Sequence, residues 1–217
     1  MKISNETIGV LKNFATINTN ILIREGNVLS TISTGKNMFA RAQVAETFPK
    51  EFAIYDLNTL LALLTFMEDQ DVDFGDKSLT ISKEGGTFEY YYSDPSIIVA
   101  APDKTIEVEG VFSFNITAAD VNMINKAAAI VSAPVVSVIS KGGKVTMSVG
   151  DPKTAASNAY RKVIGECDID FDARLDMENF KIVPEAYEVT VSKKLFHFKN
   201  ESKNLKYWIA LNTDSSV

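Results

Sequence analysis

Near the start of the chain, apolar side chains recur at the spacing of an amphipathic helix over residues 2–17. One half of the helical wheel holds Ile8, Val10, Leu11, Phe14, Ala15 and Ile17. Ser4 is a good N-cap, and Glu6 lies in the first turn, where the helix dipole favours an anion. The opposite half holds Asn5, Gly9, Lys12, Asn13 and Thr16. This exposed face is predicted to carry one lysine and no acid.

The pattern then changes to short alternating runs, which predict strands. Residues 20–25 and 28–33 are expected to form a hairpin with its turn at Gly26-Asn27, and residues 38–44 follow. Asp56 is a natural N-cap for a second helix over residues 57–67. Further strands are predicted over residues 71–75, 78–82 and 87–92, with a turn at Glu84-Gly85-Gly86. Residues 93–110 contain two prolines and are predicted to be a surface connector.

The pattern restarts in the second half of the chain. Residues 114–131 match residues 1–18 without gaps, and residues 175–180 match residues 55–60. The order helix, strands, helix, strands therefore occurs twice, which indicates internal duplication. We predict an α+β protein with two similar domains, residues 1–104 and 105–217, and a connector at about 93–111. Two unrelated α+β domains that share helix-cap chemistry remain the alternative.

The predicted helix faces avoid carboxylates. The helix of the second copy exposes Ala118, Asn122, Asn125, Lys126 and Ala129, and the helix after Asp56 exposes Asn58, Thr59, Ala62 and Thr65. A fourth, short helix after Asp176 carries Lys181 and Glu178. The chain has 28 acids and 22 bases, so solvated faces should collect acids. Either these faces lie near a polyanion and contact its phosphates through lysines, or they are ordinary surface, or they are half-buried against a partner protein.

Composition limits the other possibilities. A net charge of -6 and a pI of about 4.9 argue against broad binding to nucleic acid or anionic membranes, but leave room for a local basic surface. One cysteine excludes an intrachain disulfide and fits a reducing compartment. The apolar run 60–67 is too short to span a bilayer, and no signal-peptide pattern opens the chain. We expect a soluble, cytoplasmic protein with no membrane partner.

No set of residues supports catalysis or metal binding. His197 lies in an alternating strand, and Cys167 is 30 positions away with no nucleophile signature around it. Residues 69–76 contain alternating carboxylates, but a calcium loop needs glycine at its sixth position, where Phe74 stands, and glutamate at its twelfth, where Thr80 stands. We expect a strand with solvent-facing acids there. We therefore predict no enzyme activity, no metal and no cofactor.

Several stretches resemble the DNA polymerase sliding clamps of T-even-like tailed phages. They are MKIS and LKNFATIN within residues 1–18, FAIYDLN at 52–58, and the Asp-Pro-Ser and Val-Ala-Ala-Pro positions within 94–106. KYWIAL at 206–211 resembles the last strand of that family. The likeness extends over the whole chain, although the second half is more diverged. It implies that each domain packs two helices on antiparallel β-sheets, the DNA clamp fold.

The resemblance implies a non-enzymatic processivity factor. Three protomers would close head to tail into a homotrimeric ring that encircles double-stranded DNA without reading its sequence. The helices would line the hole. A clamp-loader ATPase would open the ring, the replicative polymerase would be tethered by its C-terminal peptide, and factors for late transcription are further partners. The competing hypothesis is a β-rich oligomeric interaction module that does not bind DNA.

By position, the resemblance assigns two sets of candidate residues. Those facing DNA are Lys12, Lys126, Lys181, Lys2, Asn13 and Asn125, with loop residues Arg24, Lys141 and Arg161 as possible additions. The first copy has Leu61 where Lys181 stands in the second, so the hole would be only thinly charged. Those lining a pocket for the partner peptide are Ile106, Val108, Val111, Ala210 and Leu211. Ordinary packing of a connector is the alternative for this second set.

Overall fold

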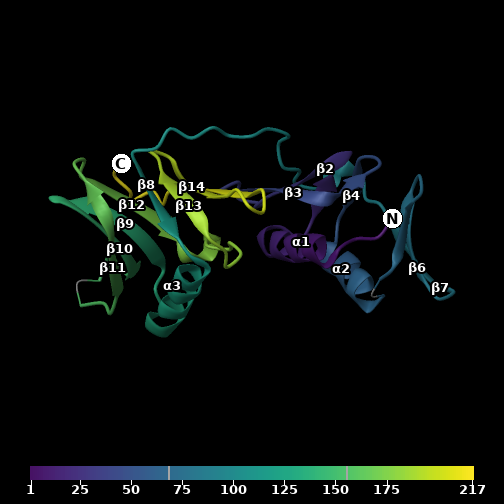
Figure 1. Cartoon of the computed structure of the whole chain (residues 1–217), viewed down its shortest axis with the longest axis horizontal. Helices are drawn as coiled ribbons and strands as arrows, with labels where there is room; N and C mark the ends of the chain where they lie inside the picture. The colour runs from purple at the N-terminus through teal and green to yellow at the C-terminus, as the bar shows by residue number, and fades with distance from the viewer. Residues whose placement is uncertain (68, 155) are drawn as a thin grey trace. The chain divides into compact units, whose positions relative to one another are not determined.

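The computed structural model describes residues 1–67, 69–154 and 156–217. The chain divides into two compact units (Figure 1). Unit 1 comprises residues 1–104 and 203–205, and unit 2 comprises residues 105–202 and 206–217.

Unit 1 contains the helices α1 (Asn5–Ile17) and α2 (Leu57–Phe66). Both expected N-caps are confirmed, since the Ser4 side chain accepts a hydrogen bond from the Thr7 backbone N–H and the Asp56 side chain accepts one from Thr59. These bonds satisfy backbone donors that the first helical turn leaves without a partner. The apolar faces of both helices are buried, with Phe14 and Leu57 completely so.

The strands of unit 1 are antiparallel. Its pairs are β1 (Ile21–Ile23) with β4 (Phe52–Ile54), β2 (Gly26–Ile32) with β3 (Met38–Phe48), and β6 (Ser78–Lys83) with both β5 (Asp71–Phe74) and β7 (Gly86–Tyr91). The turn at 84–86 and the strand with exposed acids at 71–74 are confirmed. The hairpin expected between residues 20–25 and 28–33 is wrong. All three residues of β1 are buried, and a strand covered on both faces pairs with β4 inside the core instead.

A 3₁₀ turn, η1 (Pro95–Ile97), begins the connector, and unit 2 follows with β8 (Phe112–Ile116) and α3 (Ala118–Val131). One sheet has the order β11-β10-β9-β12, from β9 (Val135–Lys141), β10 (Gly143–Gly150), β11 (Tyr160–Cys167) and β12 (Phe171–Asp176). The other strands, β13 (Tyr187–Val191), β14 (Leu195–Asn200) and β15 (Leu205–Ala210), continue from β8 in the order β8-β13-β14-β15.

The core of unit 2 lies between its two sheets and α3. Strand β10 alternates buried Val145, Met147 and Val149 with partly exposed residues, and α3 packs on this strand through Val121 and Ile124. Because side chains on a strand alternate between faces, the other face of the same sheet is left to solvent.

The fourth predicted helix is absent from the described part of the chain. Only a single 3₁₀ turn, η2 (Met177–Asn179), follows β12, so Lys181 does not lie on a helix. The Asp176 side chain makes no cap hydrogen bond and instead accepts one from Asn212 at 2.5 Å. Without a cap, and with Pro184 close behind, the segment has no room for further helical turns.

Candidate functional site

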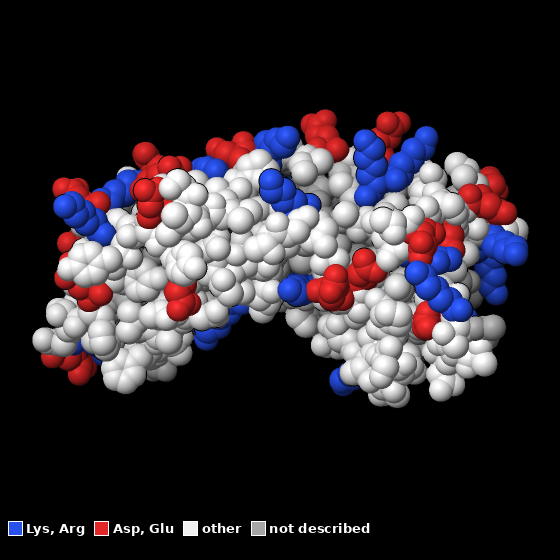
Figure 2. All heavy atoms as spheres, turned by 180° about the vertical axis from the view of Figure 1, so that it is seen from behind, with Lys and Arg blue, Asp and Glu red and all other residues white. Residues whose placement is uncertain are grey.

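The three α-helices are poor in charge. Together they contain two lysines, Lys12 and Lys126, and two acids, Glu6 and Asp120, each acid in a first turn. Glu6 is exposed, which corrects the expectation that the first helix face has no acid. Asp120 is paired with Lys162 of β11. In each unit, the side on which the helices lie is mostly white in Figure 2, while charged residues crowd along the opposite side.

Lys12 stands over a hollow formed by both helices of unit 1. The hollow has a volume of about 430 Å³. It is lined by Lys12, Asn58, Leu61, Ala62, Thr65 and Phe66. Lys12 is the only charged residue in this lining, and it makes no ion pair among the described residues. The surface thus carries a single positive charge, with Asn58 and Thr65 as polar neighbours and Leu61, Ala62 and Phe66 as apolar ones.

Lys126 lies on the exposed face of α3, one position after the residue that matches Lys12 in the repeat. It is exposed together with Asn122, Asn125 and Ala129, and no described residue forms an ion pair with it. The one acid of this helix, Asp120, is held at the N-terminus by Thr117 and Lys162. The Lys162 ammonium and the Thr117 backbone N–H lower the pKa of Asp120 to about 2. The carboxylate therefore stays ionised, and the positive charge of Lys162 compensates its negative charge.

The remaining basic candidates are scattered. Lys2 is exposed just before α1, and Asn13 is half-buried on α1. Lys181 is exposed beyond the 3₁₀ turn η2. Arg24 does not project freely, because its guanidinium donates to the Ala101 carbonyl at 2.9 Å and lies 3.8 Å from Glu51. Lys141 and Arg161 line a different hollow, on the sheet of unit 2.

The predicted peptide pocket is partly formed within unit 2. A hollow of about 400 Å³ brings Ile106, Val108 and Val111 together with the turn at residues 192–195. Ile106 and Val108 are half-exposed and alternate with exposed Glu107 and Glu109, and all four residues line the hollow. The alternative of ordinary core packing would bury these side chains fully.

Two hydrogen bonds fix the walls of this pocket. The Val111 N–H donates to Val191 at 2.8 Å, and the Trp208 indole N–H donates to the Ile106 carbonyl at 3.0 Å. Gly110 is required between them, because an added Cβ would lie 2.3 Å from the Thr190 methyl carbon. The connector therefore lies tightly against β13 without belonging to the sheet.

Ala210 and Leu211 are not in the lining of the pocket. Ala210 is exposed, and Leu211 is joined to the wall only through its backbone N–H, which donates to Lys194 at 3.0 Å. Ser192, Lys193 and Lys194 also line the pocket and were not predicted. Ser192 hydrogen-bonds within the turn, and both lysines are exposed on the pocket rim. A Ser-Lys-Lys stretch between two alternating runs is a turn signal that was available in the sequence.

Each unit presents an open sheet edge beside a helix with exposed apolar side chains. In unit 1, β7 is the edge of its sheet, and Phe88 on it lies 6.0 Å, centroid to centroid, from Phe66 at the end of α2. In unit 2, β11 is one edge strand of the sheet β11-β10-β9-β12. Met123 and Ile130 lie on the flank of α3 that Asp120 ties to this strand, and Ile130 is 82% exposed. Such edges are normally covered or paired.

The described residues show no arrangement for metal or nucleophilic chemistry. Within them, no group of three or more His, Cys, Asp or Glu side chains is placed to hold a metal ion. His197 stacks on Trp208 at 4.9 Å, and burial, helped by Lys206 and Lys199, lowers its pKa to about 4. Its imidazole is thus a neutral packing group at pH 7. No helix among the described residues has the length and apolar character needed to cross a bilayer.

Comparison with known proteins gives one consistent result. The family described as DNA polymerase processivity factor matches residues 4–100. The sliding clamp of Vibrio phage KVP40 is 29% identical over 199 residues, covering 88% of this chain and 90% of the relative. That of Enterobacteria phage T4 is 28% identical over 228 residues, covering 100% and 99%. A structure of A. fulgidus PCNA with the C-terminal region of FEN-1 bound has a TM-score of 0.69 at 12% identity, over 96% of each chain.

The fold, with helices packed on antiparallel sheets in two units, is that of the DNA clamps. The phage relatives narrow the assignment within the class of DNA clamps. The family model and the phage relatives support a narrower assignment: a sliding clamp and DNA polymerase processivity factor of the kind found in T-even-like phages. Sliding clamps are in general non-catalytic proteins that bind DNA and polymerase.

Proposed function

We propose that this clamp encircles duplex DNA as a ring of three copies, with α1, α2 and α3 facing the duplex. The observation that carries the proposal is the charge pattern of the helices. Their only bases, Lys12 and Lys126, are exposed and unpaired among the described residues, and the acid Asp120 is neutralised by Lys162. A surface against a polyanion needs few acids, whereas an ordinary solvated surface in a chain of net charge -6 should collect them.

Weak contacts suit a clamp that slides. A closed ring holds DNA by topology, so that tight binding is unnecessary and many phosphate contacts would add friction. Each lysine would act as a mobile point charge on the phosphates, without reading bases. The cost of releasing such contacts is small, since exposed ion pairs contribute about 0–1 kcal/mol.

The two open edges supply the ring contact in this proposal. Strand β7 of one copy would pair with β11 of the next, and Phe66 and Phe88 would pack against Met123 and Ile130 of that neighbour. An edge that differs from its partner gives a head-to-tail interface, which closes into a ring when the rotation allows it. The same contact would cover the most exposed apolar side chains on both helices. The copies would each contribute two domains, residues 1–104 and 105–217.

We further propose that the pocket at residues 106–111 and 192–195 takes the C-terminal peptide of the replicative polymerase. Ile106, Val108 and Val111 would contact its apolar side chains. Lys193 and Lys194 stand on the rim with no ion pair among the described residues, and they would face the terminal carboxylate. The bound C-terminal region of FEN-1 in the PCNA structure is a parallel for this mode of binding. The clamp-loader ATPase and late-transcription factors are the other partners, in the cytoplasm of the infected cell.

The double variant Lys12→Glu with Lys126→Glu separates DNA encirclement from a protein-binding role of the helix faces. We expect light scattering to give an unchanged oligomer mass, because neither lysine lies at the proposed ring contact. Loader-dependent retention on nicked circular DNA and processive synthesis should both fall, by about ten-fold or more, since two repulsive groups replace two attractive ones in every copy.

Two controls sharpen this test. Lys36→Glu with Lys104→Glu makes the same change of charge at exposed positions away from the helices and should leave retention unchanged. Linearising the DNA should release the wild-type clamp. If the helix variant instead dissociates the oligomer and leaves DNA retention of the remaining rings intact, the faces bind protein and the interaction-module hypothesis is correct.

A further inference from the structure

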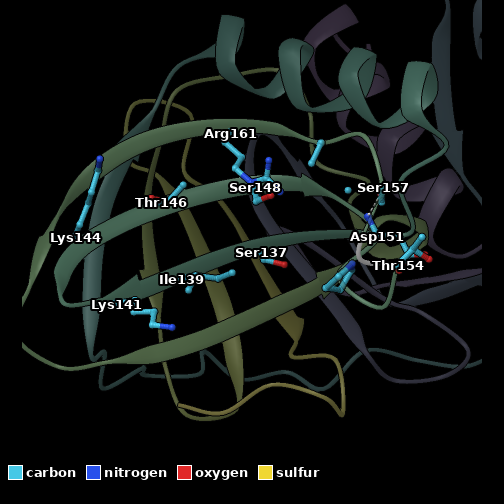
Figure 3. A pocket seen from close by; sticks show the side chains of 13 residues that line it. Ser137, Ile139, Lys141, Lys144, Thr146, Ser148, Asp151, Thr154, Ser157 and Arg161 are labelled. Atoms are coloured by element: carbon cyan, nitrogen blue, oxygen red, sulfur yellow. Dashed lines mark hydrogen bonds between the residues drawn. The ribbon is translucent and has the colours of Figure 1, made fainter.

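A second basic surface lies on the open face of the sheet β11-β10-β9-β12, away from the three helices and from the pocket for the polymerase peptide, and it includes Lys141 and Arg161, which were possible additions to the DNA-facing set. A hollow of about 460 Å³ is formed there by three strands and the loop that joins β10 to β11. Figure 3 shows Lys141 and Lys144 toward one end, Arg161 further along and Asp151 at the other end. Ser137, Ile139, Thr146 and Ser148 form the floor between them.

Strand register explains why these side chains share one face. Lys141 is directly opposite Lys144, Ser137 is opposite Ser148, and Ser148 is in turn opposite Arg161. The alternate residues Val145, Met147 and Val149 point the other way, into the core. The hollow is therefore a property of the strand pairing and not of a mobile loop.

The charge in this hollow is compensated only in part, because the three cations face one carboxylate in the lining, Asp151, and one beside it, Glu166. Two lysines directly opposite each other on neighbouring strands destabilise a sheet. None of Lys141, Lys144 and Arg161 makes an ion pair among the described residues, although Glu166 is in register with Lys144. Asp151 offsets them only in part, with one negative charge at the far end of the hollow. Its carboxylate accepts from the Thr154 hydroxyl at 2.6 Å and from the Lys153 N–H at 2.9 Å, and these bonds lower its pKa and so keep it ionised.

We propose that this hollow is a docking site for an extended acidic segment of a partner protein. The cations extend from position 144 to position 148 of β10, where Arg161 lies opposite, a span of about 13 Å along the strand. A free phosphate cannot contact both ends, whereas carboxylates four residues apart in an extended peptide match them. Hydroxyls of Thr146 and Ser148, for which no hydrogen bond is formed within the described chain, supply further donors along the floor.

A peptide fits this surface better than a nucleic acid. Asp151 closes one end of the hollow and Glu166 lies beside Lys144, so a polyanion that continued past either end would meet a carboxylate. A short acidic segment carries its charge only where the three cations lie. Ile139 adds an apolar contact on the floor, which suits a side chain of such a segment.

The test uses the full-length clamp and a fluorescein-labelled peptide of five Glu-Ser repeats, measured by anisotropy at low salt. The variant is Lys141→Gln with Lys144→Gln and Arg161→Gln. We expect the affinity of this variant for the peptide to fall about ten-fold. Each exposed ion pair alone contributes less than a ten-fold change in affinity, and the variant removes three of them. The matched control Lys36→Gln, Lys77→Gln and Lys104→Gln removes the same charge from exposed positions in unit 1 and should change affinity less than two-fold.

Three outcomes would overturn the proposal. An equal loss in the control variant would mean that binding depends only on net charge. Tighter binding of a ten-nucleotide oligothymidylate, lost in the same hollow variant, would assign the site to single-stranded nucleic acid. Full competition by millimolar inorganic phosphate would reduce it to an anion site. In support, amide NMR shifts on adding the peptide should be centred on Ser137, Thr146 and Ser148. Retention on circular DNA is a separate readout, so failure here leaves the clamp function untouched.

Discussion

The ion pair between Asp120 and Lys162 connects the candidate DNA-facing helix to the candidate ring edge, and its removal is a quantitative test of the structure. Asp120 Oδ1 lies 2.6 Å from Lys162 Nζ, while Oδ2 accepts from the Thr117 N–H at 3.0 Å and from its hydroxyl at 2.8 Å. The substitution Asp120→Asn keeps the shape and removes the charge. It weakens both the pair and the reciprocal cap of α3.

The magnitude follows from the pKa of the carboxyl, lowered from 3.8 to about 2. At about 1.4 kcal/mol for each pKa unit, the full effect would be about 2.5 kcal/mol. The Lys162 side chain is 45% exposed, so solvent screens the pair and we reduce the figure to about 1 kcal/mol. Because the folded-state pKa lies below the unfolded one, this contribution is present above about pH 4 and is lost as the pH falls toward 2.

The assay is urea unfolding of wild type and variant at fixed protein concentration, followed by Trp208. This is the only tryptophan in the chain, and it lies in unit 2 together with the ion pair. We expect Asp120→Asn to lower the unfolding free energy by about 1 kcal/mol at pH 7 and by clearly less at pH 3, with a smaller loss in high salt as well.

The matched control is Asp103→Asn, which breaks the exposed pair between Asp103 and Arg41 in unit 1. It should leave the Trp208 transition unchanged. If Asp120→Asn costs the same at pH 3 as at pH 7, the loss comes from the cap alone and the electrostatic reasoning fails. If Asp120→Asn lowers the unfolding free energy by less than about 0.3 kcal/mol at pH 7, neither the ion pair nor the cap contributes to stability as expected.

Two further predictions concern other groups. Burial holds the pKa of His197 near 4, so between pH 6.5 and 5 the unfolded state takes up the proton first and stability should fall by roughly 1 kcal/mol. His197→Phe should abolish this slope, and an unchanged slope would place the titration elsewhere. Lys193→Gln with Lys194→Gln should weaken a polymerase-type C-terminal peptide with a free carboxylate about five-fold and its amidated form hardly at all. Equal losses for both forms would show that the lysines do not contact the terminus.

Much of unit 1 follows from local patterns in the sequence. Ser4 and Asp56 cap the helices where their chemistry predicts, and Glu84-Gly85 turns the hairpin between β6 and β7. The pairing of β1 with β4 could not be predicted, since an all-apolar strand of three residues does not indicate its partner. That choice depends on tertiary packing between segments about thirty positions apart.

The site shows the same division. The uncharged helix faces and the apolar side chains of the connector could be predicted from periodicity. The shortened segment at Lys181 could not, because the N-cap residue Asp176 is engaged by Asn212, which is distant in sequence. The basic hollow could not be predicted from the sequence either, because Lys141, Lys144 and Arg161 become neighbours only through strand register.

The difference between the two edges, β7 and β11, has a consequence for mixed populations of chains. Under the proposed arrangement, a chain with a blocked β11 can still offer its β7 to a neighbour, and it then ends the assembly instead of closing it. When half of the chains are defective in this way, only about one eighth of three-membered assemblies would contain intact copies alone and be able to close. A clamp built from unlike edges is therefore open to dominant inhibition by its own damaged copies, and a single proline placed in β11 would be enough to create the inhibitor.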